Sequence, residues 1–173
     1  MILTKIIFIL LLGLILFQDF RYQAVPWILF PIGLLISIYI SITEGLKSET
    51  FFNYSSNLLF IAFQLGIIYL FTWYKNRKRM NIFKSSFGLG DFLFLLMLIP
   101  MFSPINFMIF FLSSVLFSLM FYFLLKIIGL YTKEKVPLAG FQSLFLVCLL
   151  IVQFIIDFNL YNDFLIIDKL NLL

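Results

Sequence analysis

The chain has 173 residues, of which 64% are hydrophobic and 12% are charged, and its mean hydropathy is +1.14. A soluble domain carries roughly 45–50% apolar and about 25% charged residues, so this composition excludes a water-soluble globular fold and indicates an integral membrane protein. The net charge of +4 is small and gives no reason to expect a nucleic-acid partner. With no histidine and one cysteine, Cys148, the chain excludes an internal disulfide, a Cys/His zinc site and a histidine-activated nucleophile. We expect neither a metal nor a cofactor.

Apolar runs along the chain predict an all-α, polytopic membrane protein that forms a single domain over residues 1–173. A bilayer core about 30 Å thick needs roughly 20 residues for each spanning helix, so the length allows about six spans. Pro26 suits the first turn of the second span, Pro100 stops the fourth and Pro137 opens the sixth. The predicted spans are residues 2–18, 27–42, 57–74, 88–99, 105–128 and 137–156, with a polar loop over 43–56 and a short interfacial helix over 157–173.

Basic residues are distributed unevenly between the two sides of this arrangement. The loops after the first, third and fifth spans contain Arg21, Lys75, Arg77, Lys78, Arg79, Lys84, Lys126, Lys133 and Lys135, and the opposite side contains Lys5, Lys47 and Lys169. Positive residues stay on the cytoplasmic side of a cell membrane, which predicts that both termini lie outside. The ends of the spans that carry Asp19 and Asp91 then both lie on the cytoplasmic side.

Two acidic residues lie in strongly apolar surroundings, Asp19 at the end of the first run and Asp91 at the start of the fourth. An acid within a membrane segment is costly, which makes it a candidate for function. Two neighbouring carboxyl groups can share one proton, so that one activates water while the other protonates a scissile carbonyl oxygen. Gly88 and Gly90 would let the backbone bend tightly and approach a substrate. We therefore interpret Asp19 and Asp91 as the catalytic pair of an aspartic protease.

Each acid also has a structural interpretation. Asp91 suits the first turn of a helix, where the helix dipole favours an acid, and Asp19 could pair with Arg21 at the membrane interface. The fourth run is only about a dozen residues long, or roughly 18 Å of helix, which would place Asp91 below the membrane surface. The alternative is a helix that starts earlier, near Phe83.

The two acidic motifs resemble those of the prepilin peptidases of the type IV pilin and archaellin systems, which are six-span aspartic proteases with a Gly-x-Gly-Asp motif. The first motif runs from Asp19 to Pro26 and the second from Gly88 to Asp91, and the stretch Val136–Phe141 around Pro137 is a degraded counterpart of a third. The resemblance implies catalysis by Asp19 and Asp91 and cleavage of the basic leader of a prepilin-like membrane protein at the cytoplasmic face, typically after Gly.

Several features depart from that family. Leu93 stands where the family usually has Lys, Trp27 stands where Asn or Asp usually follows the first motif, and the Cys pairs and methyltransferase portion of longer members are missing. The Gly-Leu-Gly-Asp sequence also resembles the motif of presenilins and signal peptide peptidases, which have about nine spans with their aspartates on adjacent helices. A third alternative, favoured by Leu93, is a non-catalytic or degenerate membrane component of a pilus or secretion assembly.

Overall fold

The computed structural model describes residues 2–44, 50–76, 88–131, 133, 135–155 and 160–161, and every regular element in these ranges is helical. The elements are α1 (Ile2–Tyr22), α2 (Leu29–Glu44), α3 (Thr50–Asn76), α5 (Leu89–Leu98), the 3₁₀ turn η1 (Ile99–Met101), α6 (Pro104–Ile127) and α7 (Leu138–Ile155). The predicted all-α class is therefore confirmed. Within the described ranges, four helices (α1, α3, α6 and α7) are long and apolar enough to cross a membrane, whereas α2 and the unit formed by α5 and η1 are shorter.

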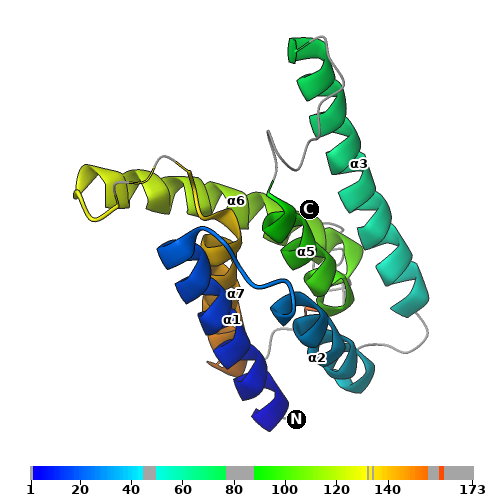
Figure 1. The fold of residues 1–173 in the computed structure, drawn as a ribbon. Coiled ribbons are helices and arrows are strands. Elements are labelled where there is room, and N and C mark those ends of the chain that lie inside the picture. The colour runs from blue at the N-terminus through cyan, green and yellow to red at the C-terminus, as the bar shows by residue number, and fades with distance from the viewer. Residues whose placement is uncertain are drawn as a thin grey trace, which may run out of the picture.

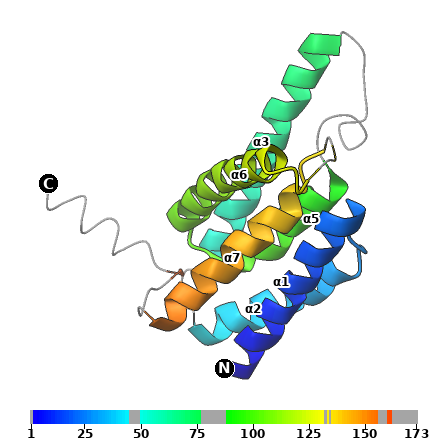
Figure 2. The same ribbon diagram turned by 90° about the vertical axis from the view of Figure 1, so that its left-hand side faces the viewer.

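The helices form a bundle in which α1 and α7 lie side by side and α5 occupies the middle (Figure 1). Helix α2 packs against both α1 and α5, and α6 packs against α7. Helix α3 extends beyond the other helices at its C-terminal end, as both views show (Figures 1 and 2). Large apolar side chains are exposed along α1, α3 and α6, and an exposed surface of this kind suits contact with lipid rather than with water.

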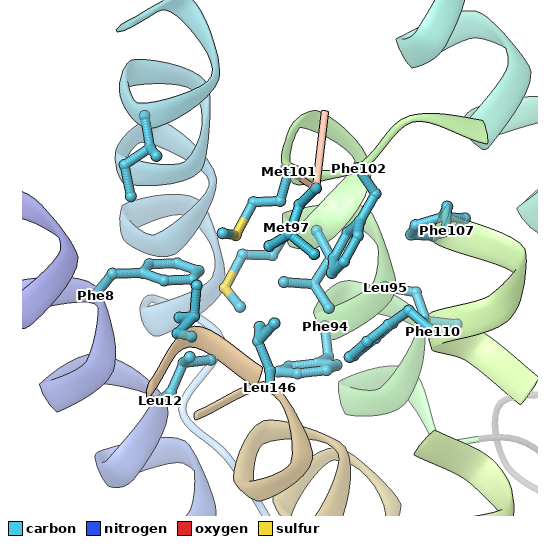
Figure 3. Packing of buried hydrophobic residues seen from close by; sticks show 14 of the residues in the cluster. Phe8, Leu12, Phe94, Leu95, Met97, Met101, Phe102, Phe107, Phe110 and Leu146 are labelled. Atoms are coloured by element: carbon cyan, nitrogen blue, oxygen red, sulfur yellow. The ribbon is translucent and has the colours of Figure 1, made fainter. Parts of the chain in front are cut away.

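The hydrophobic core is built around the short helix α5. Its residues Phe94, Met97 and Leu98 are almost fully buried, and the cluster around them takes side chains from α1, α6 and α7 (Figure 3). Helix α2 approaches α5 closely at Gly33, where an added Cβ would overlap the side chain of Met97. Because α5 contacts so many elements, its position fixes the position of Asp91 in its first turn.

Both ends of α5 are defined by identifiable residues. At the start, Gly88 is extended (φ −67°, ψ 134°), so the helix does not run back through it; the alternative start near Phe83 lies outside the described residues. Near the end, the side-chain amide of Asn57 on α3 donates hydrogen bonds to the carbonyl oxygens of Ile99 (3.0 Å) and Phe102 (2.8 Å). These carbonyls belong to a helix end and would otherwise lack partners. A neighbouring helix thus holds the C-terminal end of α5 in place.

The predicted loop over residues 43–56 is wrong at both ends, because α2 continues to Glu44 and α3 already begins at Thr50. Polar residues in this stretch form contacts between helices. Glu44 forms a 2.8 Å ion pair with Lys5 of α1, and the hydroxyl of Tyr54 donates to Ser41 Oγ of α2 at 2.9 Å. The polar composition of residues 43–56 indicated a loop. Because Glu44 and Tyr54 find polar partners on neighbouring helices, these residues can lie in helices instead. The predicted interfacial helix over 157–173 lies outside the described residues, apart from residues 160–161.

Replacing Asn57 by Ala should destabilise the bundle, because the carbonyl groups of Ile99 and Phe102 would lose a donor in apolar surroundings. We expect the free energy of unfolding to fall by about 1–3 kcal/mol, measured by thermal or denaturant unfolding in detergent micelles. The matched control is Ser55→Ala on the same helix, because the Ser55 hydroxyl is exposed and donates to Phe51 O within α3. Equal stability of the two variants would contradict the assigned role of Asn57.

Candidate active site

Asp19 lies on the buried face of α1, close to the C-terminal end of that helix. It continues a stripe formed by Phe8, Leu12 and Ile15, which recur every three or four residues and are all buried. Only 8% of Asp19 is exposed, and its Oδ2 accepts a hydrogen bond of 2.7 Å from the backbone N–H of Gly140. The stripe that packs α1 against α7 therefore also places this carboxylate at the start of α7.

Asp91 is the third residue of α5 and reaches the same place from another helix. Its Oδ1 accepts a hydrogen bond of 2.9 Å from the backbone N–H of Ala139. Gly88 is the N-cap of α5, and Asp91 also hydrogen-bonds with its backbone, as acids at this helix position often do. Asp91 therefore does lie in the first turn of a helix, as its structural interpretation predicts. It also contacts α7, and a first-turn acid does not need that contact.

The N-terminal end of α7 connects the two acids. The carbonyl of Pro137 accepts the first bond of the helix, from the N–H of Phe141 at 3.1 Å. The N–H groups of the residues that follow Pro137 have no partner within the helix, and two of them, those of Ala139 and Gly140, bind the two carboxylates. One helix end thus binds acids from α1 and α5 through neighbouring amides.

This arrangement limits the separation of the carboxyl groups. Neighbouring amide nitrogens are joined through one Cα and one carbonyl carbon, so bond lengths alone keep Asp19 Oδ2 and Asp91 Oδ1 within about 10 Å of each other. The two groups also interact electrostatically. The carboxyl groups of Asp19 and Asp91 therefore lie near each other, as predicted. Such a pair suits acid–base chemistry, and the same hydrogen bonds also suit plain helix capping.

Arg21 does not form the ion pair with Asp19 that the structural interpretation of Asp19 required. Within the described ranges, the ion pair present is that between Lys5 and Glu44. The guanidinium group of Arg21 lies over the rings of Phe17 and Tyr22, at 5.7 and 5.5 Å from their centroids. The partner of the Asp19 carboxylate is instead the start of α7.

The loop between α6 and α7 is fastened to the segment that follows Asp19. The side-chain amide of Gln23 donates to Tyr131 Oη and to the Lys135 carbonyl, both at 3.0 Å, and the Tyr131 hydroxyl donates to the same carbonyl at 3.0 Å. Burial raises the pKa of Tyr131 above its ordinary value, so the hydroxyl remains a donor at neutral pH. These bonds fix the loop that leads into α7.

Lys133 adds a second attachment in the same loop. Its ammonium group donates to the carbonyl oxygens of Phe20 and Arg21, which lie in the last turn of α1 and have no partner within the helix. A cation is favoured at this end of a helix dipole, and Lys133 also interacts electrostatically with Asp19. From the sequence, Lys133 was interpreted only as one of the basic residues that set the membrane topology. Its role in binding the C-terminal end of α1 was missed.

Three glycines near the acids differ in what they contribute. A Cβ on Gly140 would lie 3.1 Å from Asp19 Cβ and 3.2 Å from its Oδ2, and a Cβ on Gly88 would lie 2.7 Å from Asp91 Oδ2. At Gly90 the nearest atom, on Phe30, is 3.9 Å away. The expectation that Gly88 and Gly90 bend the backbone tightly is wrong. Gly88 has backbone dihedral angles that any residue can adopt, and Gly90 lies within the regular helix α5. Gly88 and Gly140 matter because they leave room for the carboxylates.

The remaining residues singled out from the sequence lie around this centre. The carbonyl of Pro26 accepts from the N–H of Leu29 at 3.1 Å, so Pro26 belongs to the turn before α2 and not to its first helical turn. Leu93, which stands where prepilin peptidases usually have Lys, packs against the hydrophobic core. In the part of the chain that the structure describes, no group of three or more His, Cys, Asp or Glu residues could hold a metal ion.

Gly140→Ala should loosen the contact between α1 and α7, because the new methyl group would press on Asp19. We expect a loss of about 1–3 kcal/mol in the free energy of unfolding, as for overpacking elsewhere. Gly90→Ala is the matched control, since its methyl group has room and Ala favours a helix over Gly by up to about 1 kcal/mol. Unfolding in detergent micelles would measure both, and a Gly140→Ala variant as stable as Gly90→Ala would refute the close contact.

Comparisons with known proteins add no assignment: no family model, no curated protein and no solved structure matches this chain. The likeness to prepilin peptidases therefore stands on the motifs around Asp19 and Asp91 alone. A function for this pair of carboxylates has to be inferred from their geometry and tested by substitution.

Proposed function

We propose that the chain is a membrane aspartic endopeptidase that cleaves the basic leader peptide of type IV prepilin-like precursors at the cytoplasmic face of the cell membrane. Asp19 and Asp91 are its catalytic pair. The observation that carries this proposal is the binding of both carboxylates to neighbouring amides at the start of α7, which brings acids from α1 and α5 together. The substrate class comes from the resemblance of the two acidic motifs.

In the proposed reaction the pair shares one proton. The ionised carboxylate takes a proton from water, whose oxygen attacks the carbonyl carbon of the scissile peptide bond, while the protonated carboxyl group donates its proton to the carbonyl oxygen. The tetrahedral intermediate then returns that proton, the C–N bond breaks, and the amine leaves with a proton from the other carboxyl group. The proton-sharing roles belong to the pair and not to either residue alone. The α7 amides stabilise the negative charge that the pair carries.

The proposed topology has six spans with both termini outside, so that the acid pair lies near the cytoplasmic side. Its support is the distribution of basic residues, together with the contact between two of the basic loops. Lys133, from the loop after α6, binds the carbonyl groups of Phe20 and Arg21 at the end of α1. The loops assigned to the cytoplasm therefore meet at the end of the bundle that carries the acids.

A non-catalytic membrane component is the alternative, and one specific observation favours it. Each carboxylate accepts a hydrogen bond from a backbone N–H of α7, which is what a purely structural helix cap would do. Leu93 packs against the hydrophobic core at the position where prepilin peptidases usually have Lys. The loss of this Lys also favours a non-catalytic role. A presenilin-like intramembrane protease would use the same two acids on a different substrate. Substitutions that keep the hydrogen bonds and remove the charge separate catalysis from capping.

Asp19→Asn and Asp91→Asn should each abolish cleavage of a leader-bearing substrate while leaving the protein folded. Asn retains a side-chain oxygen that can accept the N–H of α7 but cannot share the catalytic proton. Because the two acids act as one unit, the double variant should be no less active than either single variant. The measurements are the gel shift of a prepilin-like substrate reconstituted with each variant in liposomes, and the unfolding midpoint of each variant.

Ser55→Ala is the control for this experiment, since it removes an exposed hydroxyl on α3. Processing near the parental rate in a well-folded Asp variant would rule out the aspartic mechanism and favour the capping role. Cleavage of a non-pilin membrane helix by the parent protein, with no cleavage of a prepilin-like substrate, would favour the presenilin-like alternative.

The topology can be tested with reporters fused after Ser48, Asn81, Lys133 and the C-terminus. We expect these four positions to lie outside, inside, inside and outside, respectively, because basic residues concentrate in the loops assigned to the cytoplasm. Alkaline phosphatase activity and fluorescence of a cytoplasmic reporter give opposite signals for the two sides. A cytoplasmic signal after Ser48 would contradict the six-span arrangement.

A further inference from the structure

Gln142 of α7 is fully buried, yet neither of its side-chain polar atoms has a hydrogen-bond partner among the described residues. The Oε1 atom of Gln18, next to Asp19 on α1, is likewise buried without a partner there. Leaving a buried amide unpaired is unfavourable, because it loses its hydrogen bonds to water and gains none in return. Two such groups near one pair of acids therefore point to a small polar ligand.

The position of Gln142 on α7 relates it to Asp91. Ala139, Gln142 and Leu146 follow one another at helical spacing and share one side of α7. Ala139 binds Asp91 through its N–H, and Leu146 points toward Phe94 of α5 (Figure 3). Gln142 thus lies one turn deeper in the bundle than the acids, on the side that faces α5. The Cα–Cβ bonds of a helix tilt toward its N-terminus, which is the end of α7 that binds the two carboxylates.

Gln18 approaches the same region from α1. It shares a side of that helix with Leu11, which lies two turns earlier. Leu11 reaches α2 near Gly33, where an added Cβ would lie 3.3 Å from its side chain, and Gly33 in turn faces Met97 of α5. Gln18 therefore lies on the side of α1 that faces α2 and directly precedes Asp19, whereas Gln142 lies on the side of α7 that faces α5. The unpartnered atoms offer two donor and two acceptor positions on Gln142 and two acceptor positions on Gln18 Oε1.

We propose that Gln142, with Gln18, binds a water molecule beside Asp19 and Asp91 and positions it for attack on the scissile peptide bond. Water fits the observed groups, because a buried water needs two to four polar partners and can both accept from and donate to an amide. The proposal rests on the proposed aspartic protease function and adds to it the source of the nucleophile. Gln142 acts through this water and is a positioning residue.

The first test measures water contact directly and does not depend on catalysis. The protein would be labelled with ¹⁵N-glutamine, which gives signals from five residues, and reconstituted in liposomes for solid-state NMR. The side-chain signal that disappears in Gln142→Met belongs to Gln142. We expect this signal to gain magnetisation from water protons rapidly although the side chain is fully buried. Absence of transfer from water would overturn the proposal.

The second test measures turnover. Gln142→Met keeps a similar shape and removes both polar groups, so it should lower kcat for the leader-bearing substrate by about tenfold or more through loss of the positioned water, with KM little changed. The unfolding midpoint should stay near that of the parent. The matched control is Gln64→Met on α3, which should keep the parental kcat. A parental kcat in Gln142→Met, or an equal loss in Gln64→Met, would overturn the positioning role.

The two tests also separate this inference from the proposed function. If the parent protein cleaves no leader-bearing substrate while the Gln142 signal shows water contact, the proposed function fails and the water site stands. If the parent protein cleaves the substrate in an Asp19- and Asp91-dependent manner but Gln142 shows no water contact, the protease function stands and the water site is refuted. Restoration of part of kcat in Gln142→Asn, which retains a shorter amide, would support positioning over packing.

Discussion

A helix that begins inside an apolar bundle presents N–H groups that lipid cannot satisfy, and this constraint governs the start of α7. Asp19 and Asp91 provide the acceptors, one from α1 and one from α5. The dependence is mutual, because the positive end of the α7 dipole stabilises negative charge on the two carboxyl groups. The close packing of α1 on α7 at Gly140, the cap on α5 at Asn57 and the attachment of the Lys133 loop all serve to keep these three elements together.

Much of the helical framework could be predicted, because hydropathy and proline carry direct physical information. Apolar runs predicted the helices, Pro137 predicted the start of α7, and Pro100 predicted that α5 would be short. The proximity of Asp19 and Asp91 followed from topology, since both were assigned to the same end of the bundle. Asp19 lies at the next helical position after the buried stripe of Phe8, Leu12 and Ile15, but nearly every neighbouring position in this run is also apolar, so the sequence alone does not show which side of α1 is buried.

The rest depended on contacts between distant segments, for which a single sequence gives little signal. Polar residues before Asn57 suggested a loop, but Glu44 has Lys5 as a partner and Tyr54 has Ser41, so these residues fit into helices. The backbone amides of Ala139 and Gly140 carry no side-chain signature, so their role as partners of the acids could not be recognised. Gly140 matters for the space that it leaves beside Asp19, and the sequence does not say which residue will lie opposite a glycine.

The hydrogen bond between Asp19 and Gly140 spans 121 positions in the chain, which has a consequence for how the protein is made. Synthesis runs from the N-terminus, so α1 and α5 emerge from the ribosome before the helix end that binds their acids exists. An interrupted chain that stops before residue 138 contains both acids but lacks the amides of Ala139 and Gly140 that bind them. The hydrogen bonds that hold the two carboxylates at a common point can therefore form only after the start of α7 has been made.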